Sequence, residues 1–203
     1  MLVIAIDGPA AAGKGTLARR LAAALGLPHL DTGLLYRAVG QRVLDAGSDP
    51  ADPAIAGAAA LALEAADLAR ADLRGPAADG AASAVARHPE VRAALLAFQR
   101  RFPGTTGAVL DGRDIGTVVF PDATIKFFVT AAPEARARRR WQELGETVPL
   151  EDIESDMRDR DWRDSTRGMA PLRQADDAVL IDTTALDADT AFARALSLVP
   201  SRA

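Results

Sequence analysis

Residues 8–16 read Gly8-Pro9-Ala10-Ala11-Ala12-Gly13-Lys14-Gly15-Thr16. The run follows an apolar segment, Leu2–Ile6, that is typical of a buried strand, and it precedes leucines at 17, 21 and 25, the spacing of a helix face. Glycines let the backbone curl so that its N–H groups surround a phosphate, and the N-terminus of the helix adds a favourable dipole. Strand, loop and helix in this order predict a P-loop whose nine residues bind the phosphates of a nucleotide, with Lys14 reaching the β- and γ-phosphates.

A magnesium site is expected beside this loop. The usual P-loop has a serine or threonine directly after the lysine, whereas here Gly15 takes that place and the hydroxyl comes at Thr16. Asp111 ends the apolar run Val109-Leu110, and the end of such a strand is where P-loop proteins hold a second acidic group near Mg²⁺. Thr16 and Asp111 are therefore predicted to hold Mg²⁺ weakly, in part through water. Alternatively, Asp111 is only a turn residue and has no role in metal binding.

The rest of the chain alternates short apolar runs with helical patterns. The runs are Val109–Leu110, Ile125–Val129, Val179–Ile181 and a weaker one at His29-Leu30. Helices are expected after the P-loop, over residues 34–46, within the alanine-rich stretch 49–80, over 82–100 with an interruption at Pro89, after Pro133, over 151–162 and over 188–198; residues 74–76 are left undetermined. This alternation predicts an α/β fold with a mainly parallel sheet.

The composition excludes several classes of protein. The 203 residues include no cysteine, which rules out disulfide scaffolds, thiolate zinc sites and thiol catalysis and favours a reducing compartment, the cytoplasm. The net charge of −4 argues against general nucleic-acid binding. Apolar runs are far shorter than a membrane span. We therefore expect neither nucleic acid nor membrane as a partner.

Further candidates are charged and polar residues that share a helix face or lie at a sheet edge. Thr32 and Tyr36 lie four apart behind Asp31, and Arg37 adjoins them; the alternative is a helix cap beside a surface arginine. The other sets are Arg113 with Asp114 at a sheet edge, Arg160 with Asp164 and Arg167, and Arg136 with Arg139 and Arg140. For the last two sets the alternatives are an ion-pair ladder and a solvated basic face, both of little energetic value.

Several stretches together resemble one family. They are Ile6–Thr16, Asp31-Thr32-Gly33 with Tyr36-Arg37, Ser83, Pro89-Glu90-Val91-Arg92, the distinctive Asp111–Ala123, and Arg160-Asp161-Trp162-Arg163-Asp164 with Arg167 before Ala170-Pro171-Leu172. On these residues the chain resembles, over nearly its whole length, the bacterial cytidylate kinases, nucleoside-monophosphate kinases of the P-loop class.

The resemblance implies an activity, transfer of the γ-phosphoryl group of ATP to CMP or dCMP, and a fold of five parallel strands flanked by helices in one kinase domain, residues 1–203. It implies a core of about 1–30, 105–140 and 165–203, a monophosphate-binding lobe of about 31–104 and a lid of about 141–164. Family members of larger size carry a small antiparallel sheet, for which the short stretch near 61–80 leaves no room. A monomer is expected.

The resemblance also implies roles for individual residues. Ser83, Arg92 and Asp114 would contact the cytosine, and Arg160 with Asp164 the ribose. Arg37, Arg113 and Arg167 would hold the acceptor phosphate, with Thr32 and Tyr36 nearby, and Arg136, Arg139 and Arg140 would act on the transferring phosphate together with Lys14.

Two other functions compete. One is a P-loop kinase of another small acceptor, such as a different nucleoside monophosphate or a shikimate-like compound. The other is a regulatory GTPase, which reads guanine with an asparagine-containing loop; this chain has no asparagine.

Overall fold

The computed structural model describes residues 1–73 and 75–200. Arg74, part of the segment left undetermined from the sequence, and residues 201–203, the end of the expected core, lie outside the described residues. Contacts divide the chain into two compact units, which we call the sheet unit (Met1–Leu30 and Pro103–Ala203) and the helical unit (Asp31–Phe102). Each is described by itself.

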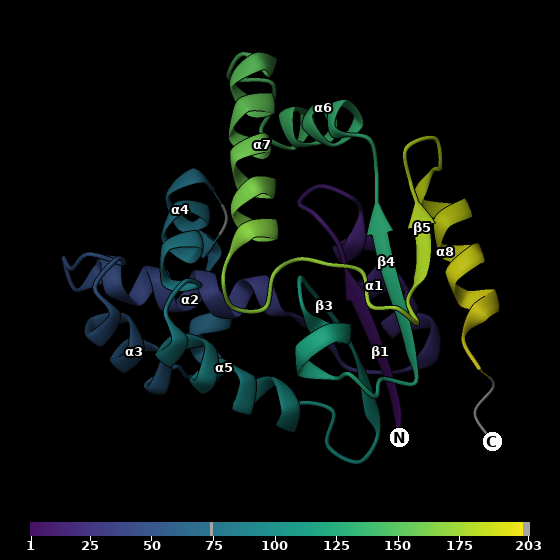
Figure 1. Ribbon diagram of the computed structural model, residues 1–203, viewed down its shortest axis with the longest axis horizontal. Helices are drawn as coiled ribbons and strands as arrows, with labels where there is room; N and C mark the ends of the chain where they lie inside the picture. The colour runs from purple at the N-terminus through teal and green to yellow at the C-terminus, as the bar shows by residue number, and fades with distance from the viewer. Residues whose placement is uncertain (74, 201–203) are drawn as a thin grey trace. The chain divides into compact units, whose positions relative to one another are not determined.

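The sheet has five strands in the order β2-β3-β1-β4-β5. They are β1 (Leu2–Asp7), β2 (His29–Asp31), β3 (Gly107–Gly112), β4 (Ile125–Thr130) and β5 (Val179–Asp182), and the pairs β1–β3, β1–β4 and β4–β5 are parallel (Figure 1). The expected α/β class with a five-stranded parallel sheet is confirmed. Every residue of β1 and β3 is buried, as expected for parallel strands that are covered on both faces.

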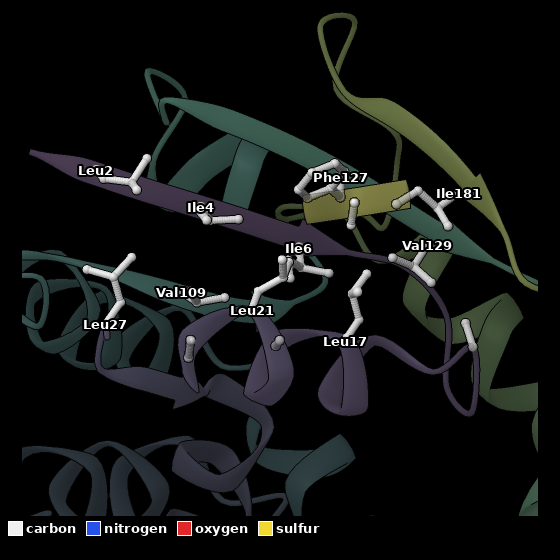
Figure 2. Packing of buried hydrophobic residues seen from close by; sticks show 14 residues of the cluster. Leu2, Ile4, Ile6, Leu17, Leu21, Leu27, Val109, Phe127, Val129 and Ile181 are labelled. Atoms are coloured by element: carbon white, nitrogen blue, oxygen red, sulfur yellow. The ribbon is translucent and has the colours of Figure 1, made fainter. Parts of the chain in front are cut away.

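The sheet unit also contains several helices. They are α1 (Lys14–Leu25), α6 (Pro133–Glu143), α7 (Leu150–Thr166) and α8 (Ala188–Leu198), with a π-helical turn, η3, over Ile115–Val119. Two of the leucines that predicted α1, Leu17 and Leu21, point from it toward the sheet near Ile6 (Figure 2). Because only the short loop of residues 8–13 separates α1 from β1, this core fixes the first turn of the helix beside the carboxyl end of the central strand.

The helical unit is built from helices joined by short connections. They are α2 (Thr32–Asp45), α3 (Pro53–Leu61), the 3₁₀ turns η1 (Ala65–Ala69) and η2 (Ala71–Leu73), α4 (Pro76–Val85) and α5 (Pro89–Arg101). Prolines at 53, 76 and 89 occupy first-turn positions, where the missing N–H costs nothing. The described part of residues 32–102 contains no strand, in agreement with the expectation that the antiparallel insertion is absent.

Helices α2 and α4 approach each other closely. A Cβ atom added to Gly40 of α2 would lie 2.8 Å from the Cβ of Ala81 and 2.9 Å from its carbonyl carbon. No side chain fits there, so the contact depends on glycine facing alanine.

Among the described residues no helix combines the length and the apolar character needed to cross a bilayer.

Candidate functional site

The loop between β1 and α1 has the backbone of a phosphate cradle. Gly8 has φ of 148°, and a Cβ there would lie 1.9 Å from the carbonyl oxygen of Val129, so only glycine fits. Gly13, which caps α1, has φ of 88°, and Ala11 has φ of 55°, a left-handed conformation that costs an alanine free energy. Strain kept in a loop before a helix N-terminus points to a functional backbone shape.

Lys14 lies across this loop. Its side chain is buried at 6% exposure, and Nζ donates a hydrogen bond of 2.7 Å to the carbonyl oxygen of Pro9. The ammonium group is thereby directed at the turn of the P-loop, where phosphate oxygens would accept from the backbone N–H groups.

Asp7, the last residue of β1, is a buried carboxylate that the sequence reasoning did not select. Burial raises its pKa to about 6, although hydrogen bonds from the backbone N–H groups of Gly116 and Ile115, at 2.7 and 2.8 Å, act in the opposite direction. The negative charge of Asp114 also raises this pKa, and Lys14 lowers it. Asp7 ties the P-loop strand to the turn that follows Asp114.

Asp111, at the carboxyl end of β3, lies beside the P-loop helix. One oxygen, Oδ1, is 2.7 Å from Nε2 of His29, and the other, Oδ2, is 3.8 Å from the position that a Cβ on Gly15 would take. Thr16 in the same helical turn is exposed, with its hydroxyl 3.4 Å from Nη2 of Arg19. A carboxylate and a hydroxyl are hard oxygen donors that suit Mg²⁺, so these residues fit the metal. Within the described residues no three acidic, histidine or cysteine side chains gather as a metal cluster.

Arginines and aspartates that directly follow β3, or that lie on α7 and its C-terminal cap, form a second cluster. Arg113 Nε donates to Asp164 Oδ2 at 2.7 Å, and both side chains are less than one-fifth exposed. Burial alone would raise the pKa of Asp164, but the charge and hydrogen bond of Arg113 lower it below its usual value of 3.8. Arg167 Nη2 lies 3.9 Å from Asp114 Oδ1, and Arg160 is close enough to lower the pKa of Asp164 as well. These residues are brought together inside the sheet unit.

The arginines of α6 do not behave as one solvated face. Arg136 is 4% exposed; it donates to Asp161 at 2.7 and 3.2 Å and to the P-loop carbonyl of Ala10 at 3.4 Å. Arg139 donates to Thr183, whose hydroxyl donates to the P-loop carbonyl of Ala12. Arg140 lies 3.3 Å from Glu143 at the surface.

The helical unit holds the remaining candidates. Arg37 on α2 donates to Asp79 on α4 at 2.9 Å, and Arg92, 8% exposed, lies over the ring of Tyr36 at 5.9 Å. Thr32 is buried in the first turn of α2, after Asp31 accepts a capping hydrogen bond from Gly33, and Ser83 is half-buried on α4.

Sequence reasoning missed four carboxylate or histidine partners. The sequence gives no signal that His29 contacts Asp111, which is 82 positions away. Asp79 and Asp161 likewise pair with arginines that are 42 and 25 positions away. Only Asp7 carried a local signal, since it is a charged residue that follows the apolar run Leu2–Ile6 directly before the P-loop.

The comparisons with known proteins agree with this geometry. The family model for cytidylate kinase matches residues 4–201. The cytidylate kinase of Granulibacter bethesdensis is 62% identical over 201 residues, covering 98% of this chain and 96% of the relative. Those of Acidiphilium cryptum and Paramagnetospirillum magneticum are each 59% identical, covering 98% of this chain and 95% and 98% of the relatives.

Two solved structures share the fold. An uncharacterised protein from Eubacterium ventriosum superposes with a TM-score of 0.60 at 15% identity, with both chains fully covered. A gluconokinase from Sinorhizobium meliloti gives 0.52 at 14% identity, covering 97% of this chain and 90% of the other. At such identities these likenesses concern the fold alone. The identity of more than half of all residues over almost the full length, together with the P-loop and the clusters beside it, shows that the chain belongs to the cytidylate kinase family.

Proposed function

We propose that the chain transfers the γ-phosphoryl group of ATP to CMP or dCMP, giving ADP and CDP or dCDP. The observation that carries this conclusion is a family match that spans residues 4–201 of a chain whose Lys14 lies across a strained phosphate loop. The same match favours a nucleotide acceptor over the small acceptors of other P-loop kinases. No observation favours a regulatory GTPase.

The reaction needs positioning and charge neutralisation more than proton transfer. The acceptor is a phosphate oxygen of CMP, whose second pKa near ~6 leaves it ionised at neutral pH, so no general base is required. It attacks the γ-phosphorus of ATP as the bond to the β–γ bridging oxygen breaks, and ADP leaves with that electron pair. Two polyanions must approach each other, and cationic side chains have to offset their repulsion.

The proposed cationic groups come from several elements. Lys14 binds the β- and γ-phosphates, and Arg37, Arg113 and Arg167 hold the acceptor phosphate. The ion pair of Arg113 with Asp164 keeps the guanidinium in place before substrate arrives. Arg136, Arg139 and Arg140 act on the transferring phosphate; the contact of Arg136 with Ala10 supports this role, since it places one of them at the P-loop.

Magnesium is proposed as the metal that accompanies ATP. Thr16 and Asp111 are the residues that would hold it, and it would neutralise charge on the β- and γ-phosphate oxygens. Residues 141–164, which include most of α7, are proposed to act as a lid that excludes water and so prevents hydrolysis of ATP.

Cytosine recognition is assigned to Ser83, Arg92 and Asp114. Cytosine presents an amino donor at N4 and acceptors at N3 and O2, which an aspartate and an arginine can satisfy, whereas uracil presents an acceptor at O4 and a donor at N3. With UMP the carboxylate would face O4 and the guanidinium would face N3–H. A site built to hydrogen-bond a substrate group can reject an analogue without it by about 10⁴–10⁵. Arg160 and Asp164 are proposed to hold the ribose.

A coupled assay with ATP and a panel of acceptors tests the proposal. CMP and dCMP should exceed UMP, AMP and shikimate in kcat/KM by orders of magnitude. Asp114→Ala should lower turnover of CMP and shrink the CMP/UMP ratio at the same time. Equal turnover of AMP or shikimate would contradict the function, and an unchanged ratio in the variant would contradict only the assignment of Asp114.

The setting proposed for this activity is the cytoplasm, because the substrates are intracellular nucleotides and the chain has no cysteine to oxidise. We propose that it acts as a monomer, with ATP and CMP or dCMP as its partners and without nucleic acid or membrane, in keeping with its negative net charge.

A further inference from the structure

Two ion pairs in the helical unit resemble each other, and only one involves a residue of the proposed site. Arg37 Nε donates to Asp79 Oδ1 at 2.9 Å, and Arg42 Nη1 donates to Asp67 Oδ2 at 2.8 Å. Both arginines belong to α2, and both carboxylates are mostly buried, Asp79 at 13% and Asp67 at 14% exposure. Arg37 is the one proposed to hold the acceptor phosphate. Arg42 has no such role.

The ion pair with Asp79 determines which edge of the Arg37 guanidinium faces Asp79 and which edge points away from it. Asp79 binds the Nε edge, while Nη1 lies 3.7 Å from the position that a Cβ on Gly33 would take. The Nη end is therefore directed at the first turn of α2. An anion at this end of a helix would also meet the positive end of the helix dipole.

Asp79 itself is held in a fixed place. It lies on α4 one turn before Ser83, so the two residues share a face of that helix. Helix α4 is locked against α2 where Gly40 meets Ala81. The carboxylate and the arginine thus stand on two helices whose separation is set by backbone contact.

We propose that Asp79 is a positioning residue for the substrate phosphate, which holds Arg37 in its phosphate-binding orientation before CMP arrives. This inference rests on the proposed function. A long side chain that must be ordered at binding weakens affinity by about three- to tenfold, and an ion pair already made in the free protein removes that cost. Asp79 acts through Arg37, since a carboxylate in contact with the phosphate would repel it.

Calorimetric titration of the full chain with CMP and with cytidine separates this role from a merely structural one. Asp79→Ala should weaken CMP binding about three- to tenfold and leave cytidine, which has no phosphate, unchanged. Asp79→Asn should restore most of the loss, because its amide oxygen still accepts from Nε. Asp67→Ala is the matched control: it removes a carboxylate of similar burial that pairs with another arginine of α2, and CMP affinity should stay at the wild-type value.

A double-mutant cycle with Arg37→Ala completes the test, because in that background Asp79→Ala should have no further effect on CMP affinity. Equal weakening of cytidine and CMP, tighter binding of CMP, or the same loss without Arg37 would overturn the inference. If Asp79→Ala does not fold, Asp79→Glu replaces it and should weaken CMP alone. Wild-type protein that neither binds nor phosphorylates CMP would refute the proposed function, whereas a normal wild type with an unaffected Asp79→Ala refutes only the inference.

Discussion

Both units bury large apolar side chains, such as Ile4 in the sheet unit and Leu35, Leu73 and Leu95 in the helical unit, but the share of small buried residues differs. The core of the sheet unit consists of large apolar groups, with Ile4, Ile6, Leu21 and Phe127 at 1% exposure or less. In the helical unit small residues fill much of the interior, namely Ala38, Gly40, Ala56, Gly57, Ala60, Ala78, Ala81 and Ala82. Large side chains stabilise through the area they bury, whereas small ones let backbones approach. The core of the sheet unit thus rests mainly on buried apolar area, whereas the helical unit adds a close backbone approach between α2 and α4.

The largest effect is expected from a cavity in the sheet unit. Phe127→Ala removes a ring that packs between β4, β1 and α1, and it should lower the free energy of unfolding by about 3–5 kcal/mol. Denaturant unfolding measures this loss. A decrease below about 1 kcal/mol would mean that the large core does not carry the stability assigned to it.

Lys14→Ala tests the catalytic role of the P-loop, which lies next to the apolar core of the sheet unit. Losing a charge that acts mainly in the transition state should reduce kcat by about 10²–10³, or roughly 3–4 kcal/mol, without loss of stability. The other lysine of the chain is the control: Lys126 is also buried, but it pairs with Asp177 at 2.8 Å. Lys126→Ala should therefore lower stability more than turnover. Unchanged kcat in Lys14→Ala would refute the phosphate role.

Gly40→Ala tests the close fit of the helical unit. The added Cβ would meet the backbone of Ala81 at 2.9 Å, so we expect a loss of about 1–3 kcal/mol and a higher KM for CMP with KM for ATP unchanged. Gly80→Ala on α4 is the matched control, because a Cβ there meets nothing within 4 Å and alanine is the better helix former. Equal stability of the two variants would contradict the comparison.

The smallest effect concerns pH and Asp7. Its pKa of about 6 lies above the unfolded value of 3.8 because the carboxyl is buried, so the folded state holds the proton more tightly. The resulting stability is complete below the unfolded pKa and is lost as pH rises through about 6. Between pH 5 and pH 7 wild type should lose about 1 kcal/mol relative to Asp7→Asn. Parallel unfolding curves for the two proteins across this range would show that Asp7 does not titrate there.

Local patterns predicted much of the sheet unit. The apolar runs marked all five strands, and the leucine spacing of α1 followed directly from its packing on the sheet. The alanine-rich segment was harder, because alanine favours a helix everywhere and carries no periodic pattern. A helix was expected within residues 49–80, with 74–76 undetermined; the structure has α3 up to Leu61, two 3₁₀ turns within residues 62–73, and α4 from Pro76. The π-helical turn of 115–119 had no signal at all, since it depends on Asp7 binding two of its N–H groups from 108 positions away.

The residues of the candidate site likewise include some that local patterns predicted and others that they did not. Lys14 and Asp111 could be named from their place after a strand, because the carboxyl ends of neighbouring parallel strands meet at one edge. The partners of the candidate residues are distant in sequence: His29 lies 82 positions from Asp111, and Asp161 lies 25 positions from Arg136. No rule of spacing connects such residues. The assignments of Ser83, Arg92 and the ribose contacts rest on the family resemblance and stay predictions.

Arg136 connects the P-loop, where ATP is proposed to bind, with α7, which belongs to the proposed lid. One guanidinium donates to Ala10 in the P-loop and to Asp161 in α7, so a change of loop shape and a change of helix position alter the same set of bonds. Thermodynamic reciprocity then applies: if bound ATP stabilises one position of α7, anything that holds α7 in that position strengthens ATP binding by the same factor. A single substitution at Asp161 would therefore be read out as a change in nucleotide affinity, although Asp161 need not touch the nucleotide.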